Sequence, residues 1–367
     1  MQPQNIPTKD PQHNTKKELA QFYTTKYAYI FQGLDIPMGS RVIEPFSGTG
    51  QLCVWAATKG FYDVETYDLD PKTERAETRD SILNPPNYKD KFVVTNPPFL
   101  ALNKTDAKEP FEKWKTNDLY KCFVLSIVEG DCSGGSIILP LNFFCDDRKV
   151  EARDKFLSKY TVERLNIFEE TVFDDTDYIV CAIQFKRSEQ KNNTATVDTY
   201  IFPDKINIKL SLTKSNNWKV APEVYEKVKT KLKVSRLTHK EVLSDDYRNK
   251  VIKPEKENKI TNMFLHTVDG GSDSNRISLS YKNVPFLAKD TDRVFATIVI
   301  DPPITVETQK EVIRIFNEEL ETLRKKYNSL FLINFRTSTK HYARKRIGFN
   351  VAYNMIAKIL EDIEKNT

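Results

Sequence analysis

The first half of the chain alternates between two kinds of segment. One kind is a short apolar, β-branched run that ends at Gly, Pro or an acidic residue, and the other has apolar residues at helical spacing. These runs predict strands at 41–44, 64–68 and 92–95. Apolar spacing predicts helices over 16–34 and after Gly50, and Asp70-Pro71 fits the cap and first turn of another. This alternation favours an α/β domain.

The pattern changes after Arg187. Residues 188–194 are polar and fit a linker or an exposed hairpin tip. Strands are predicted at 196–202, 206–212 and 331–335, and helices at 222–233 and 307–327. We therefore expect two domains, 1–187 and 188–367, of which the second is α+β.

The strand at 92–95 runs into Asn96-Pro97-Pro98-Phe99. Two prolines fix φ and remove two N–H donors, so this segment should form a stiff turn at the carboxyl end of a strand. Open α/β sheets bind their ligands at that edge. Asn96 Oδ1 and the Pro97 carbonyl can accept both N–H bonds of an exocyclic amine, while Phe99 stacks on the ring. Taken alone, the segment equally fits a Pro-Pro turn that closes a strand.

A second turn follows the strand at 41–44, which ends in Glu44. Gly48 and Gly50 allow the backbone to approach a ligand closely, and the following helix offers free N–H groups. There is no third glycine as in dinucleotide-binding loops, and a carboxylate at this place would repel a pyrophosphate. It would attract a cation, which favours S-adenosylmethionine over NAD.

Two further acidic residues, Asp68 and Asp80, are candidates for contact with a cofactor. Asp68 ends the strand at 64–68, from which an acid can accept both ribose hydroxyls. Asp80 could accept from the cofactor's adenine amine, although an ordinary loop aspartate is equally consistent.

Together these segments resemble, in order and spacing, the amino-group DNA methyltransferases of the N6-adenine group that have target recognition last. The motifs are 21–25, 44–50, Asp68, Asp80 and 96–99, and the resemblance covers about 16–187. It implies a doubly wound, Rossmann-like methyltransferase domain with a helix from 118 and strands at 134–140, 164–168 and 178–185. One departure is Thr24-Thr25, where many relatives have Thr-Pro.

The resemblance also implies the site residues. The expected catalytic residues are Asn96, Pro97, Pro98 and Phe99. The expected cofactor residues are Tyr23, Thr24, Glu44, Pro45, Phe46, Ser47, Gly48, Asp68, Leu69 and Asp80. Residues 101–117 are polar and are interpreted as a mobile lid beside the target base, or as a plain surface loop.

The implied activity is transfer of a methyl group from S-adenosylmethionine to N6 of a flipped adenine in duplex DNA, without a metal. A restriction endonuclease acting separately would be a partner in a restriction-modification system. Two alternatives stay open: an RNA adenine-N6 methyltransferase, and an inactive nucleic-acid-binding subunit.

Charge is unevenly distributed. Residues 1–187 carry 24 Lys and Arg against 28 Asp and Glu, whereas residues 188–367 carry 32 against 23. A basic half suggests a polyanion-binding module. The segments 268–276 and 335–346 are the candidates for DNA contact, with solvated loops as the alternative. The expected DNA-binding residues are Arg276, Arg336, Lys340, Arg344, Lys345 and Arg346.

The five cysteines are scattered and show no CxxC or Cys/His spacing, which favours reduced thiols over disulfides or zinc. No signal peptide or membrane-spanning run stands out. We therefore expect an intracellular protein, cytoplasmic or nucleoid-associated.

Overall fold

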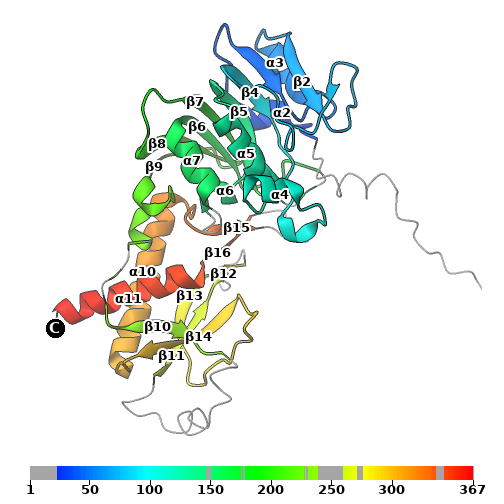
Figure 1. Cartoon of the computed structure of the whole chain (residues 1–367). Helices are drawn as coiled ribbons and strands as arrows, with labels where there is room; N and C mark the ends of the chain where they lie inside the picture. The colour runs from blue at the N-terminus through cyan, green and yellow to red at the C-terminus, as the bar shows by residue number, and fades with distance from the viewer. Residues whose placement is uncertain are drawn as a thin grey trace, which may run out of the picture. The chain divides into compact units, whose positions relative to one another are not determined.

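The computed structural model describes residues 23–145, 150–174, 176, 178–226, 228, 230–238, 259–270, 276–335 and 343–366. The chain forms two compact units, Met1–Trp218 and Lys219–Thr367 (Figure 1). The first unit extends past the boundary expected at residue 187, because two strands in 194–213 continue its sheet.

The first unit is a mixed α/β fold with a large central sheet. Its described strands pair in the order β3-β2-β1-β4-β5-β7-β6-β8-β9. The pairs from β3 to β5 are parallel, whereas β7 is antiparallel to both β5 and β6. The strands are β1 (Arg41–Glu44), β2 (Val64–Asp68), β3 (Glu77–Thr78), β4 (Lys91–Thr95), β5 (Gly134–Pro140), β6 (Tyr160–Phe168), β7 (Val180–Arg187), β8 (Thr194–Phe202) and β9 (Ile206–Thr213).

Helices connect these strands and cover the sheet, with α5 and α7 in front of it in Figure 1. The central β5 is buried along its whole length, as a strand covered on both faces should be. The helices of this unit are α2 (Tyr27–Ile30), α3 (Gln51–Thr58), η1 (Leu102–Lys104), α4 (Glu109–Trp114), α5 (Leu119–Glu129), α6 (Asn142–Cys145), α7 (Glu151–Lys159) and η2 (Lys214–Asn216).

The strand order contains a switch point between β1 and β4. The chain leaves β1 through α3 and returns at β2 on one side, whereas it leaves β4 through α4 and α5 and returns at β5 on the other. Because such crossovers are right-handed, the two connections leave a crevice beyond the carboxyl ends of β1 and β4. The strands at 41–44, 64–68, 92–95 and 134–140 are confirmed.

Two helix predictions in this unit are wrong. In the described part of 16–34 the α-helix covers only Tyr27–Ile30, because the chain turns at Gly33, where φ is +72°. Residues 16–22 lie outside the described residues. No helix begins at Asp70-Pro71 either. The Asp70 N–H donates to Asp68 Oδ1 at 2.8 Å, and the chain turns toward β3.

The second unit is α+β, as expected. Its main sheet has the order β10-β14-β11-β13 with antiparallel neighbours, and a smaller sheet has the order β12-β16-β15. Its elements are η3 (Pro222–Val224), β10 (Lys233–Arg236), β11 (Ile260–His266), β12 (Val268–Asp269), β13 (Ser278–Tyr281), β14 (Phe295–Asp301), α10 (Val306–Tyr327), β15 (Ile333–Phe335), β16 (Arg344–Arg346) and α11 (Phe349–Asn366).

The long helix α10 confirms the prediction at 307–327. Its buried Val312, Phe316 and Leu320 recur at helical spacing, and the helix packs against β11 and β13 of the main sheet. The helix predicted at 222–233 is wrong, because the described residues there form only the short η3 before β10 begins. Residues 227 and 229 lie outside the described residues.

Within the described residues, no helix is both long and apolar enough to cross a membrane. Searching the same residues finds no cluster of three or more His, Cys, Asp or Glu side chains suited to a metal ion. All five cysteines are free thiols.

Candidate active site

The Asn-Pro-Pro-Phe segment leaves the sheet at the switch point. Phe92, Val93 and Val94 anchor β4 in the core, between β1 and β5. The ladder ends after Thr95, because the prolines that follow have no N–H to donate. Asn96 is thereby set at the carboxyl end of β4, as the sequence predicts.

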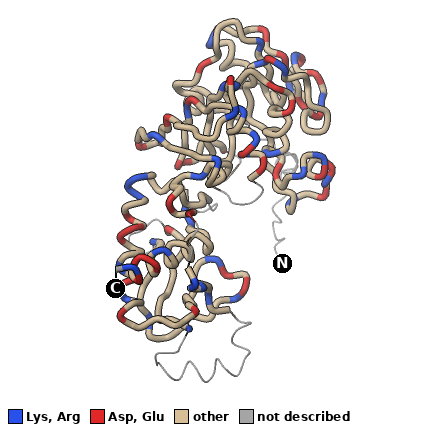
Figure 2. Tube along the Cα trace, turned by 60° about the vertical axis from the view of Figure 1, so that its left-hand side comes forward, with Lys and Arg blue, Asp and Glu red and all other residues tan. Residues whose placement is uncertain are grey.

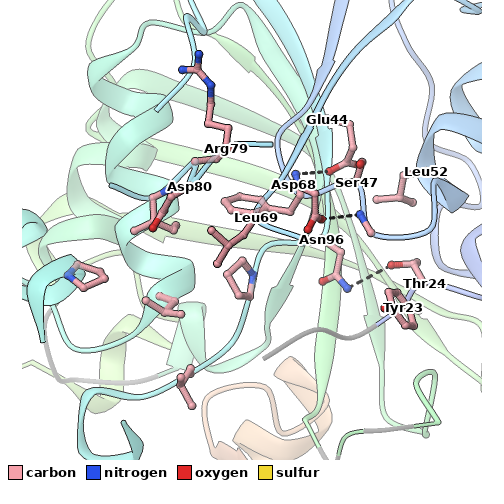
Figure 3. Close-up of a pocket in the computed structure, with 18 of the residues that line it drawn as sticks. Tyr23, Thr24, Glu44, Ser47, Leu52, Asp68, Leu69, Arg79, Asp80 and Asn96 are labelled. Carbon is pink, nitrogen blue, oxygen red and sulfur yellow. Dashed lines mark hydrogen bonds between the residues drawn. The ribbon is translucent and has the colours of Figure 1, made fainter. Parts of the chain in front are cut away.

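The Asn96 amide is held by a residue from far away in the chain. Its Nδ2 donates to Thr24 Oγ1 at 3.2 Å, and the Thr24 side chain is buried (Figure 3). An amide is planar, so Oδ1 points away from Thr24. Asn96 also lines the cavity described below, and the expected contact between its Oδ1 and an amine stays a prediction.

Glu44 ends β1 and is 1% exposed. Its Oε1 accepts from the Phe46 N–H at 3.1 Å and from the Thr95 hydroxyl. Oε2 is buried and has no hydrogen-bond partner among the described residues. Burial raises the pKa of this carboxyl to about 8, against the lowering effect of both hydrogen bonds. A cationic ligand in the cavity would satisfy Oε2 and favour the ionised form.

The glycine turn is fastened to the end of β2. The Gly48 N–H donates to Asp68 Oδ2 at 2.7 Å, and the Ser47 N–H donates to the Tyr67 carbonyl at 2.9 Å. Gly48 and Gly50 have φ of +51° and +83°, and a Cβ on Gly48 would lie 3.2 Å from the Tyr23 ring. Asp68 therefore shapes the turn, and each of its oxygens keeps a lone pair for a ligand.

Asp80 caps a turn of its own. Its Oδ1 accepts from the N–H groups of Ile82 and Leu83, both at 2.9 Å. This explains why an aspartate stands there without any ligand. Its carboxyl nevertheless lines the same cavity as Glu44 and Asp68, so the expected contact with a cofactor stays a prediction.

These side chains surround one cavity of about 260 Å³ (Figure 3). Of the expected residues, the cavity is lined by Tyr23, Thr24, Glu44, Phe46, Ser47, Gly48, Asp68, Leu69, Asp80, Asn96 and Pro98. Three of them are carboxylates, whereas the guanidinium of Arg79 points away from the other labelled side chains in Figure 3. Asp68 and Asp80 therefore favour a cationic ligand in the cavity, and Glu44, whose pKa is raised by burial, would ionise beside one.

Three expected residues lie in the protein interior. Pro45 and Pro97 are buried, and Phe99 is 1% exposed, with its ring packed edge to face against Tyr120 and Tyr178 at 5.7–6.2 Å. In this position Phe99 supports the turn from behind. Its stacking on a substrate ring stays a prediction.

The segment 101–117, expected to be a mobile lid or a plain surface loop, forms part of the cavity wall. Thr105, Pro110 and Phe111 of this segment line the cavity, as do Leu100 and Leu119 on either side of it. Main-chain bonds close this segment at its base, from Leu102 N to Asn117 O at 3.0 Å and from Leu119 N to Leu100 O at 3.1 Å.

A side chain also joins this segment to the turn after Asp80, because Trp114 Nε1 donates to the Ile82 carbonyl at 2.9 Å. The segment is therefore tied to both the Asn96 turn and the Asp80 turn. The only sequence signals for this wall were isolated apolar residues such as Phe111 and Leu119.

The cavity wall also includes residues that the sequence did not single out. Gln51 and Leu52 begin α3, and Ser81 and Ile82 follow Asp80. These four residues adjoin the glycine turn or Asp80 in the sequence. That proximity was the signal from which they could have been predicted.

The expected DNA-binding residues lie in the second unit. Arg344, Lys345 and Arg346 form β16, which pairs with β12 through Val268 and Asp269. The two candidate segments, 268–276 and 335–346, therefore meet in one small sheet. Arg276 is described, whereas Arg336 and Lys340 lie outside the described residues.

No family model and no curated protein matches the sequence. Solved structures do show similarity. A modification subunit assigned to a type I restriction enzyme of Vibrio vulnificus is 14% identical (TM-score 0.38), with 55% of this chain and 51% of that one covered. A type I methyltransferase subunit of Streptococcus thermophilus is 15% identical (0.33; 55% and 50%). The type IIG restriction endonuclease BpuSI is 12% identical (0.38; 94% and 53%). The chain spans about half the length of each.

Proposed function

We propose that the protein methylates the exocyclic N6 amine of adenine in duplex DNA, with S-adenosylmethionine as methyl donor. The observation that carries this proposal is that Asn96 and Glu44 line one cavity at the switch point of the sheet, and that Glu44 Oε2 is buried without a hydrogen-bond partner among the described residues. A hydrogen-bond acceptor for an amine and a receptor for a cation are thereby adjacent.

The hydrogen-bond acceptors and apolar residues that line the cavity suit this cofactor. Glu44 Oε2 needs a cationic or N–H partner, and S-adenosylmethionine carries both a sulfonium and an α-ammonium group. Asp68 would accept from its ribose hydroxyls and Asp80 from its adenine amine, with Leu69 and Pro98 as apolar walls. When bound, the cofactor supplies an electrophilic methyl group.

The chain's own contribution is to activate a weak nucleophile. The lone pair of an adenine amine is delocalised into the ring. If Asn96 Oδ1 and the Pro97 carbonyl accept its two N–H bonds, the nitrogen moves toward a tetrahedral shape and its lone pair becomes localised. This chemistry needs no covalent intermediate, and no cysteine is among the described residues that line the cavity.

An adenine inside a duplex cannot reach such a cavity, so the target base has to be flipped out. Residues 219–367 carry 28 Lys and Arg against 20 Asp and Glu, a surplus suited to phosphate contact. Figure 2 shows both signs of charge along this unit, and β16 consists of the three cations Arg344, Lys345 and Arg346. We assign backbone contact to Arg276, Arg344, Lys345 and Arg346.

A buried ion pair fixes the base of one of these segments. Arg324 of α10 bonds Asp269 at 2.6 Å, and the Asp269 carboxylate also accepts from the Ile277 N–H at 2.8 Å. Both ends of the connection between β12 and β13 are thus held by one carboxylate. This anchoring supports a role in DNA recognition, because a segment that contacts DNA has to be held at a fixed place.

One experiment tests the whole proposal. The protein is incubated with radiolabelled S-adenosylmethionine and with duplex DNA, RNA or protein, and the labelled nucleic acid is digested to nucleosides. We expect label in N6-methyladenine from duplex DNA at a short specific sequence. Label in N4-methylcytosine, in RNA only or in protein only would overturn the choice of substrate. No label in any of them would favour the inactive binding subunit.

A further inference from the structure

The hydrogen bond between Thr24 and Asn96 joins two elements that are far apart in the chain. Thr24 lies just before α2 in a short turn, where the Thr25 N–H donates to the Tyr23 carbonyl at 3.1 Å. Its side chain is 4% exposed, so its hydroxyl is held in the interior beside Asn96. In Figure 3 the two side chains point toward one another across the cavity wall.

An asparagine amide needs such a contact if it is to act as an acceptor. The last torsion of an asparagine side chain is broad and roughly two-fold, and the two prolines after Asn96 restrict only the backbone. In one orientation Oδ1 faces the cavity. In the other, the amide NH₂ faces it and would oppose the N–H donors of a substrate amine.

A substrate amine makes these two orientations unequal, and Thr24 supports the one in which Oδ1 accepts from the amine. With Oδ1 turned to the cavity, Nδ2 is turned inward and must find an acceptor, because a buried unpaired donor is costly. Thr24 Oγ1 is that acceptor at 3.2 Å. Threonine is also stiff at χ1, so the hydroxyl keeps its place.

We propose that Thr24 is a positioning residue that keeps Asn96 Oδ1 turned toward the amine during methyl transfer. This inference rests on the proposed function and deepens it. It differs from a cofactor contact by Thr24, because a positioning role acts on the rate at saturation and a cofactor contact acts on affinity.

The test compares Thr24→Val with Thr24→Ser and Thr24→Ala. Valine keeps the shape of threonine and removes the hydroxyl, serine keeps the hydroxyl, and alanine removes it without a β-branch that could clash. Thr25→Val is the matched control, because Thr25 is exposed and adjacent. For each variant, kcat is measured at saturating cofactor and duplex DNA, and the cofactor Kd is measured by calorimetry.

We expect kcat to fall by about tenfold in Thr24→Val and Thr24→Ala, the scale of one lost hydrogen bond in the transition state. The cofactor Kd should stay within about twofold, and Thr24→Ser and Thr25→Val should keep kcat near wild type. Unchanged kcat with a weakened Kd would overturn the inference and make Thr24 a cofactor contact. Loss of kcat in Thr24→Ser as well would also overturn it, because the hydroxyl would not be the cause. If wild type itself transfers no methyl group to DNA, it is the proposed function that has failed.

Discussion

Cofactor affinity should depend on pH through Glu44. Its carboxyl is buried at the end of β1, and desolvation raises its pKa to about 8, helped by the nearby charge of Asp68. In the free protein at neutral pH the group is therefore mostly protonated. A cationic cofactor next to Oε2 favours the ionised form, so binding should release a proton.

The size of the effect follows from that pKa. Below pH 8 the ionised fraction of Glu44 rises about tenfold per pH unit, which corresponds to about 1.4 kcal/mol of binding free energy. Between pH 6 and pH 7.5 the affinity should therefore increase about 20-fold. Higher pH is less informative, because the α-amino group of the cofactor itself loses its proton near pH 8.

Isothermal titration calorimetry of S-adenosylmethionine binding at pH 6, 6.5, 7 and 7.5 measures this dependence. Repeating the titration at pH 7 in buffers with different ionisation enthalpies gives the number of protons released on binding. We expect nearly one proton per cofactor bound. Glu44→Gln should show a weak affinity that hardly changes with pH. A wild-type Kd that stays constant over this range, without proton release, would refute the reasoning.

Three further predictions concern the amine, the ribose and the DNA backbone. Asn96→Ala should abolish methyl transfer and leave the cofactor Kd largely unchanged, and substantial residual turnover in a transfer assay would contradict its assignment. Asp68→Ala should weaken cofactor binding by about 1–3 kcal/mol by calorimetry, because it loses charge-assisted bonds; unchanged affinity would move the ribose contact elsewhere. Replacing Arg344, Lys345 and Arg346 by Ala should weaken binding to every DNA sequence and flatten the slope of log K against log[salt] by about 0.9 per lost phosphate contact. A wild-type slope would show that these cations face solvent.

The strands around the site could be predicted from sequence because each is short, apolar and ended by a residue with a clear physical effect. Glu44 closes β1, Asp68 closes β2 and the Pro97-Pro98 pair ends the ladder of β4. The order of these strands in the sheet makes the switch point, and the motifs lie at their carboxyl ends. Local chemistry was sufficient here.

The helix expected over 16–34 shows where local chemistry fails. Phe31 and Leu34 are buried, as their spacing suggested, but they reach the core from a turn at Gly33. Apolar spacing reports which side chains are buried, and more than one backbone path can bury the same set. Similarly, the strands at 196–202 and 206–212 were predicted, the second from its alternating pattern, but the sheet they join is set by the parallel pairing of β8 with β6. That pairing has no local signature.

The sequence predicted that 101–117 could lie beside the site. The contacts that fix this segment, and the support of Asn96, could not be predicted for a related reason. The segment between Leu102 and Leu119 is fastened by main-chain bonds, which any residue can make, so its polar composition suggested mobility. Thr24 and Asn96 are each visible as motif residues, yet their hydrogen bond spans 72 positions of the chain. The sequence can therefore indicate which side chains line the cavity. Which of them hold one another in place depends on the fold, as the hydrogen bond between Thr24 and Asn96 shows.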